Sequence, residues 1–168
     1  MLFRSILSKP AIKDQKNHLL SRLSTQSPDQ RLTKLPGFPE ITLEVDGTTL
    51  HFFNTHLDYR GDPAIRIAQV EETLQILESI AGPAILAGDL NARPGADELQ
   101  PLFNRLSDAW AVNDSEKEPG YTFPSDQPDR RIDYILHSEQ FQVERAFTID
   151  TQASDHLPVV ADLLLSRN

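Results

Sequence analysis

The chain has 168 residues, of which 39% are hydrophobic, so its length and composition fit one globular domain with a sizeable core. It contains no cysteine, which excludes a disulfide framework, a thiolate zinc site and a cysteine nucleophile. The net charge of −9 argues against broad electrostatic binding to nucleic acid. The sequence shows no secretory signal and no apolar run of about 20 residues, so we expect no membrane span and a cytoplasmic protein.

Residues 1–37 form the least organised part of the sequence. They are polar and rich in Ser, Gln and Lys, and Pro10, Pro28 and Pro36 interrupt them. This pattern predicts one or two short elements and a long loop rather than a domain. We therefore expect the domain proper to span residues 38–168.

The pattern sharpens from Pro39 onward. Asp46-Gly47 stands between two β-rich runs, which predicts a hairpin whose second strand covers Leu50 to Thr55. Asp62-Pro63 then predicts the start of a helix, and Gly82-Pro83 its end. Apolar residues recur between these points at steps of three and four, which predicts an amphipathic helix; they are Ile67, Val70, Leu74, Leu77 and Ala81.

The second half of the chain continues this alternation. Residues 83–89 are a short apolar run that predicts a buried strand, and Asp97 could cap a short helix through Leu102. Residues 113–130 are polar and turn-rich, which indicates a long loop. Three further strands are predicted over 131–137, 141–150 and 157–165. The whole order indicates a mixed α/β fold with sheet and helix layers.

Four short segments place an acid, an amide or an imidazole at or just beyond a predicted strand end. They are NTHL at 54–57, GDLN at 88–91, RIDY at 131–134 and SDHLP at 154–158. Polar groups from several strand ends can converge on one rim of a sheet, where α/β enzymes place their sites. Carboxylates without thiols suit a hard cation such as Mg²⁺.

Each of these segments also has a structural interpretation. Asp89 and Asn91 could hold a water and a substrate oxygen, or form an Asx-turn after the strand. His56 could donate to a phosphoryl oxygen, or pack under a loop. His156 needs a carboxylate partner from elsewhere, for which Asp133 is the best candidate; otherwise it is a satisfied surface histidine.

Taken in order, these four motifs resemble the endonuclease/exonuclease/phosphatase superfamily over roughly residues 38–165. The resemblance implies part of a four-layer αββα sandwich with mixed, mostly antiparallel sheets. It also implies hydrolysis of a phosphoester, most simply a phosphodiester, by in-line attack of an activated water. Mg²⁺ is the implied cofactor, with Mn²⁺ as an alternative.

The resemblance also implies a role for each motif residue. His56 corresponds to the histidine that donates to the scissile phosphate. Asp89 corresponds to the residue that orients or deprotonates the attacking water, and Asn91 to the one that binds a phosphate oxygen. Asp133 corresponds to the carboxylate paired with the final histidine, here His156.

Asp155 corresponds to the acidic neighbour that helps to bind the metal. Family members also carry an upstream segment with an early Asn and a metal-binding Glu, which we do not find in this sequence. The resemblance is therefore to a member without its N-terminal part, and we expect weak Mg²⁺ binding and self-association through exposed sheet. Two alternatives remain: an inactive remnant or interaction module of the same fold, and a DNA-repair-type nuclease.

Overall fold

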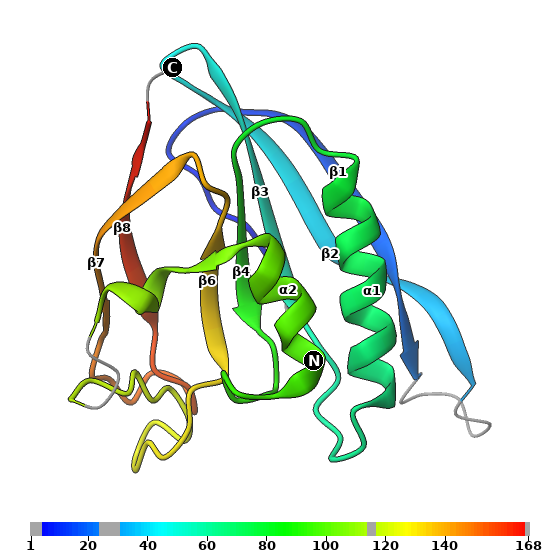
Figure 1. Cartoon of the computed structure of the whole chain (residues 1–168), viewed down its shortest axis with the longest axis vertical. Helices are drawn as coiled ribbons and strands as arrows, with labels where there is room; N and C mark the ends of the chain where they lie inside the picture. Colours follow the sequence, from blue (N-terminus) through cyan, green and yellow to red (C-terminus); the bar gives the residue numbers. More distant parts are fainter. Residues whose placement is uncertain (1–4, 24–30, 114–116, 167–168) are drawn as a thin grey trace.

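The computed structural model describes residues 5–23, 31–113 and 117–166 (Figure 1). The first half contains β1 (Ile12–Leu23), β2 (Leu32–Val45), β3 (Thr48–His56), α1 (Ala64–Glu78) and β4 (Ala84–Asp89). The second half contains the 3₁₀ turn η1 (Asp97–Leu99), α2 (Gln100–Arg105), β5 (Ser107–Asp108), the 3₁₀ turn η2 (Ala109–Val112), β6 (Asp133–His137), β7 (Phe141–Thr148) and β8 (Val159–Leu165). In the described part of the chain, no helix is long and apolar enough to cross a membrane.

Within these residues, six strands form a large sheet in the spatial order β1-β2-β3-β4-β6-β5, and β7 and β8 form a small sheet. The strands β3 and β4 are parallel, with α1 as their crossover, and the other paired neighbours are antiparallel. This mixed, mostly antiparallel arrangement confirms the predicted fold class.

One face of the large sheet is covered by α1 and α2, which lie on the same side of it in Figure 1. Side chains from the sheet and both helices form the larger hydrophobic core there. Its most buried members include Leu20, Phe38, Phe53, Val70, Leu77, Leu86, Leu102 and Leu136. Burying each such side chain stabilises the fold by about 1.5–3 kcal/mol.

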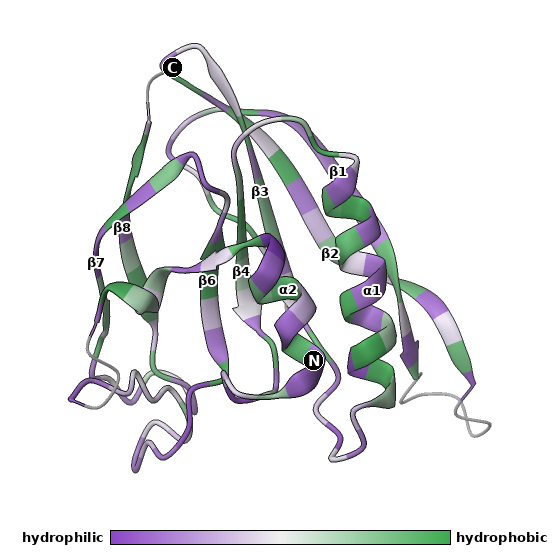
Figure 2. Cartoon of the chain, in the orientation of Figure 1, coloured by the Kyte–Doolittle hydropathy of each residue, from purple (hydrophilic) through white to green (hydrophobic). Residues whose placement is uncertain are grey.

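The small sheet packs on the other face of the large sheet. Because strand side chains alternate between faces, Ile41, Leu43 and Ile85 point away from the helices and form a second core with Phe141 of β7. Apolar residues dominate β8, as Figure 2 shows. The result is a helix layer, the large sheet and the small sheet, which are three layers of the expected sandwich.

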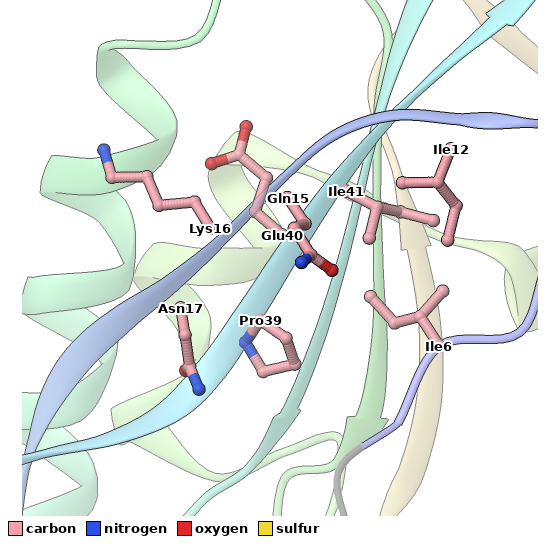
Figure 3. Close-up of a pocket in the computed structure, with 8 residues that line it drawn as sticks. All are labelled: Ile6, Ile12, Gln15, Lys16, Asn17, Pro39, Glu40 and Ile41. Atoms are coloured by element: carbon pink, nitrogen blue, oxygen red, sulfur yellow. The ribbon is translucent and has the colours of Figure 1, made fainter.

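The end of the large sheet formed by β1 and β2 carries a pocket of about 410 Å³ (Figure 3). Ile6, Ile12 and Ile41 gather at one end of this pocket, and Ile6 also packs against the second core. Ile6, which precedes β1, therefore contacts the sheet here.

The structure confirms the hairpin and the helix and refines their ends. Asp46 and Gly47 have φ values of +50° and +80° and join β2 to β3, as a two-residue turn with two left-handed residues requires. The Asp62 side chain accepts a hydrogen bond from the Ala64 N–H, at 3.0 Å, so α1 begins after Pro63. It ends at Glu78, before the predicted Gly82-Pro83 stop.

The prediction of a poorly organised segment over residues 1–37 is wrong for the part that the structure describes. Residues 12–23 form β1 along its whole length, and the expected boundary at 37/38 falls inside β2. The first six residues of β1 are polar or exposed, because β1 is an edge strand. Sheet edges often carry charge, and this removes the apolar alternation that would reveal a strand.

Two smaller expectations also need correction. Ile67 is 43% exposed, and the buried side of α1 contains polar Gln69 and Thr73 beside Val70 and Leu77. Gln69 is accepted in the core because its amide bonds two backbone groups, the Asp58 N–H and the Ser21 carbonyl. Asp97 does not cap a helix but is the first residue of η1.

Candidate active site

Three predicted site residues come together through strand register. His56 ends β3, Asp89 ends β4 and Asp133 begins β6, at the end of the sheet toward which the β4 arrow points in Figure 1. His56 is the register partner of Asp89, and Asp89 is the register partner of Asp133. The three residues therefore stand side by side on neighbouring strands, as the sequence predicts.

A glycine allows β3 and β4 to meet closely just before this row. Gly88 has a φ of +148°, and a Cβ atom there would lie 1.9 Å from the carbonyl oxygen of Thr55. Only glycine fits this position without moving the backbone. The close approach holds Asp89 beside His56, whose Nε2 lies 3.5 Å from Asp89 Oδ2.

The segment after β4 turns back toward the site. Asn91 adopts a φ of +50°, and its N–H donates to Asp89 Oδ1 at 2.8 Å, so the Asx-turn interpretation is correct as far as the backbone is concerned. The Asn91 amide donates to the Leu57 carbonyl at 3.0 Å. An amide nitrogen carries two hydrogens, so this bond orients the side chain and leaves one donor for a ligand.

His156 reaches the same edge of the sheet from the segment that leads into β8. Its Nδ1 lies 2.8 Å from Asp133 Oδ2, which confirms the predicted contact between these two residues. Ligand atoms of Asp89, Asp133 and His156 all lie within 4.8 Å of one another, and this is the group among the described residues that could hold a metal ion.

The carboxylates and the imidazole shift each other's pKa values. Burial and the negative charge of Asp133 raise the pKa of Asp89 to about 6. Burial alone lowers the pKa of His156, but the hydrogen bond and charge of Asp133, with the charges of Asp89 and Asp155, outweigh it and raise that pKa. The site thus favours a proton on the imidazole and disfavours a second negative charge beside Asp133.

Asp155 stands apart from this group. It is exposed and is not among the three residues whose ligand atoms cluster, although its charge acts on both Asp89 and His156. Its assignment as a metal ligand therefore stays a prediction.

The donor set fits a hard divalent cation. Asp89 and Asp133 bring two carboxylates together in a half-buried site, where a cation would offset the burial and the charge of Asp133 that raise the Asp89 pKa. Mg²⁺ prefers carboxylate oxygens, and Mn²⁺ accepts imidazole as well. The residues that are present can thus hold such an ion.

The sequence did not reveal one neighbour of the site, the loop before β6. The Phe123 ring packs on the His156 imidazole with 4.7 Å between ring centroids. Ser125 holds the backbone beside His156, since its N–H donates to the Asp155 carbonyl at 2.9 Å. The sequence predicts this segment only as a polar loop, because the distant contact of a loop residue leaves no local pattern.

The remaining histidines have structural partners. Glu40 bridges two of them, with one oxygen 2.6 Å from His18 Nε2 and the other 2.7 Å from His51 Nδ1. His137 is buried and its Nδ1 lies 3.0 Å from the Ser138 carbonyl. These contacts give all three histidines a structural role.

Comparison with known proteins identifies the family. The model of the Endonuclease/Exonuclease/phosphatase family matches residues 6–156, while no curated protein matches the sequence significantly. The human nocturnin catalytic domain with bound sulfate is similar in structure, with a TM-score of 0.74 and 24% identity over 93% of this chain and 60% of that one.

Two bacterial structures are similar to the same degree. An endonuclease/exonuclease/phosphatase from Bacteroides vulgatus has a TM-score of 0.73 and 20% identity over 93% of this chain and 66% of that one. The mannosyl-6-phosphatase of Bacteroides thetaiotaomicron has a TM-score of 0.71 and 22% identity over 92% and 67%. The chain thus spans about 60–67% of the length of these three structures.

The family match covers most of the chain and includes all four motifs up to His156, and the fold and the row of strand-end residues agree with it. This protein therefore belongs to the endonuclease/exonuclease/phosphatase family, whose members are hydrolases of phosphoesters.

Proposed function

We propose that the protein is a metal-dependent phosphodiesterase. The observation that carries the proposal is the convergence of Asp89, Asp133 and His156, with ligand atoms within 4.8 Å, beside His56 and Asn91. A phosphodiester is anionic and resists attack by hydroxide, so its hydrolysis needs positive charge and a positioned water. In this site, the carboxylates can bind a cation and position a water, and the imidazoles and the Asn91 amide can donate to the phosphate.

The metal would be held by the carboxylate oxygens of Asp89 and Asp133, with the exposed Asp155 as a proposed additional ligand. Mg²⁺ or Mn²⁺, when bound, supplies charge that neutralises the phosphate and acidifies a coordinated water.

The protein's own side chains divide the remaining work. The Asn91 amide hydrogen that Leu57 does not engage and the His56 imidazole donate to non-bridging phosphate oxygens. The Asp89 carboxylate orients the attacking water, whose proton passes to solvent as the new P–O bond forms. The opposite P–O bond breaks, and the leaving oxygen takes a proton from solvent.

His156 contributes positive charge near the phosphate. The Asp133 carboxylate bonds to Nδ1 and favours the protonated ring, so Nε2–H is the remaining donor. A charged donor stabilises the negative charge that develops on the phosphoryl oxygens in the transition state.

The test compares bis-p-nitrophenyl phosphate, a diester, with p-nitrophenyl phosphate, a monoester, in Mg²⁺, Mn²⁺ or EDTA. We expect metal-dependent turnover that is faster with the diester. His156→Ala and Asp89→Ala should each lower kcat at least ~10²-fold with little change in folding. The exposed Asp126 on a neighbouring loop offers the control Asp126→Ala, which should keep wild-type turnover.

The alternatives predict different results. An inactive remnant would show neither turnover nor calorimetric binding of Mg²⁺ while remaining folded. A DNA-repair-type nuclease would cleave a duplex oligonucleotide with an abasic site much faster than the chromogenic diester.

A further inference from the structure

The imidazole of His156 is held by two side chains, and only one of them is a hydrogen-bond partner. Asp133 fixes Nδ1, but a single hydrogen bond leaves the ring free to tilt about the bonded atom. The Phe123 ring packs against the imidazole, with centroids 4.7 Å apart and planes inclined by 50°. Together, a bonded atom and a packed face define where the second nitrogen, Nε2, points.

The position of Phe123 is fixed because hydrogen bonds hold its loop against the segment that contains His156. The Leu157 N–H donates to the Thr122 carbonyl at 2.7 Å, on one side of His156 in the chain. On the other side, the Ser125 N–H donates to the Asp155 carbonyl at 2.9 Å, and Ser125 Oγ donates to the Ser154 carbonyl at 2.6 Å. Thr122 and Ser125 are both buried.

A second set of contacts holds Phe123 within the loop itself. The Phe123 N–H donates to the Arg130 carbonyl at 3.1 Å, and the Arg130 N–H donates to the Phe123 carbonyl at 3.3 Å. The Arg130 guanidinium lies 5.2 Å from the centroid of the Phe123 ring. Backbone pairing and the cation–π contact thus fix the ring that meets His156.

We propose that Phe123 is a positioning residue: with Nδ1 bonded to Asp133, the packed Phe123 ring sets the plane of the His156 imidazole and thereby fixes where Nε2 points. The placement of the ring follows from the contacts above. Its effect on turnover rests on the function proposed for this site. A misplacement of about 1 Å can reduce the rate of an enzyme by roughly 10²-fold, so loss of the Phe123 ring should lower kcat.

The first measurement is made on the wild-type protein. Nuclear Overhauser effects between the Phe123 and His156 rings should be present in the wild-type protein, with His156 assigned among the five histidines by a His156→Gln spectrum. Their absence would overturn the proposal.

The second measurement uses variants on the same loop. Phe123→Leu removes the ring and should broaden or shift the His156 Nδ1–H signal, whereas Phe123→Tyr keeps a ring and should restore it. Tyr121→Leu changes a nearby aromatic side chain that is 39% exposed and should leave His156 unchanged. Phe123→Leu should lower kcat roughly 10-fold or more with KM within about two-fold.

The outcomes separate positioning from folding and from function. If Phe123→Leu changes only the unfolding temperature and leaves the His156 signal and kcat as they are, the proposal is wrong. If Phe123→Leu does not fold, the wild-type Overhauser effects and Phe123→Tyr decide. If the His156 signals respond as expected but the wild type shows no turnover, positioning stands and the proposed function fails.

Discussion

Asp133 Oδ2 and His156 Nδ1 are 2.8 Å apart, although 23 residues separate them in the chain. Asp133 belongs to the large sheet, whereas His156 precedes the first strand residue of β8 in the small sheet. The contact therefore connects the two sheets at the end where His56 and Asp89 also lie. Packing of the sheets against each other is thus a condition for assembling the site.

Replacing Asp133 by asparagine tests this contact. Asp133→Asn keeps the side-chain shape but removes the charge that raises the His156 pKa, so this pKa should fall below the wild-type value because burial opposes the charged ring. We expect kcat to fall about 10²–10⁴-fold. Histidine titration by NMR measures the pKa, and the diester assay measures kcat.

Asp126→Asn is the matched control, since it makes the same change at an exposed aspartate. It should change neither the titration nor kcat. A wild-type His156 titration curve in Asp133→Asn would show that the hydrogen bond does not govern the imidazole.

The raised pKa of Asp89 predicts an unusual effect on stability. Its folded-state pKa is about 6 against an ordinary value of 3.8, so folding favours the neutral carboxyl. Ionising Asp89 therefore lowers the free energy of unfolding as the pH rises through this window, and the full loss is present above pH 6. Asp89→Asn cannot ionise, so without metal it should be more stable than wild type at pH 7.5, by on the order of 1–3 kcal/mol.

This difference should vanish below about pH 3.8, where Asp89 is neutral in both states. Added Mg²⁺ should stabilise the wild type more than Asp89→Asn, since the proposed site holds the ion through this carboxylate. Urea unfolding at several pH values, with Mg²⁺ or EDTA, measures both effects. A variant less stable than wild type at pH 7.5 in EDTA would contradict the electrostatic argument.

Glu40 provides a test of stability away from the site. Glu40 is 7% exposed, and its carboxylate accepts one bond from each of two imidazoles, His18 and His51. Glu40→Gln replaces one acceptor oxygen by a donor, so one imidazole must either lose its partner or change its tautomer to accept from the new amide. We expect the free energy of unfolding to fall by about 1–3 kcal/mol, while kcat per folded molecule stays unchanged.

Glu44→Gln on the same strand is the control, because Glu44 pairs with Lys13 in an exposed ion pair worth at most about 1 kcal/mol. Equal losses of stability in the two variants would mean that the buried Glu40 bridge stabilises the fold no more than the exposed Glu44–Lys13 pair does.

The parts of the fold that the sequence could predict are those with local signals. The Asp46-Gly47 pair predicts the β2–β3 hairpin because these residue types favour a two-residue turn. The continuous apolar run over residues 83–89 predicts the buried strand β4. His56, Asp89 and Asp133 could be placed side by side in advance because each stands at a strand end. Asp133 and His156 could be paired in advance because one imidazole needed one carboxylate.

What the sequence could not predict depends on tertiary context. β1 is stabilised by its ladder with β2, and not by its mostly exposed side chains. Gln69 is buried because two distant backbone groups bond to it. Phe123 lies in a loop whose contact with His156 comes from the meeting of two segments, which no local pattern records.

We propose, finally, that the chain self-associates through β8. This strand pairs only with β7 among the described residues, and a two-stranded sheet is marginal in water. An unpaired edge of apolar residues is a template for pairing with another chain. Two copies can pair β8 against β8 about a two-fold axis, which would extend the small sheet to four strands.

The matched variants Leu164→Lys and Ile67→Lys test this prediction. Leu164 is 49% exposed on β8 and Ile67 is 43% exposed on α1, so each change replaces an exposed apolar residue and adds one positive charge. Leu164→Lys should shift the wild-type dimer toward monomer, and Ile67→Lys should not. Salt should strengthen the dimer, since each copy carries a net charge of −9 and salt screens the repulsion between the copies.

Light scattering after gel filtration, from 5 to about 200 μM protein, measures the mass of the particles. Association through β8 would be ruled out if the wild type stays monomeric throughout this range at high salt. Equal effects of the two variants would rule it out as well.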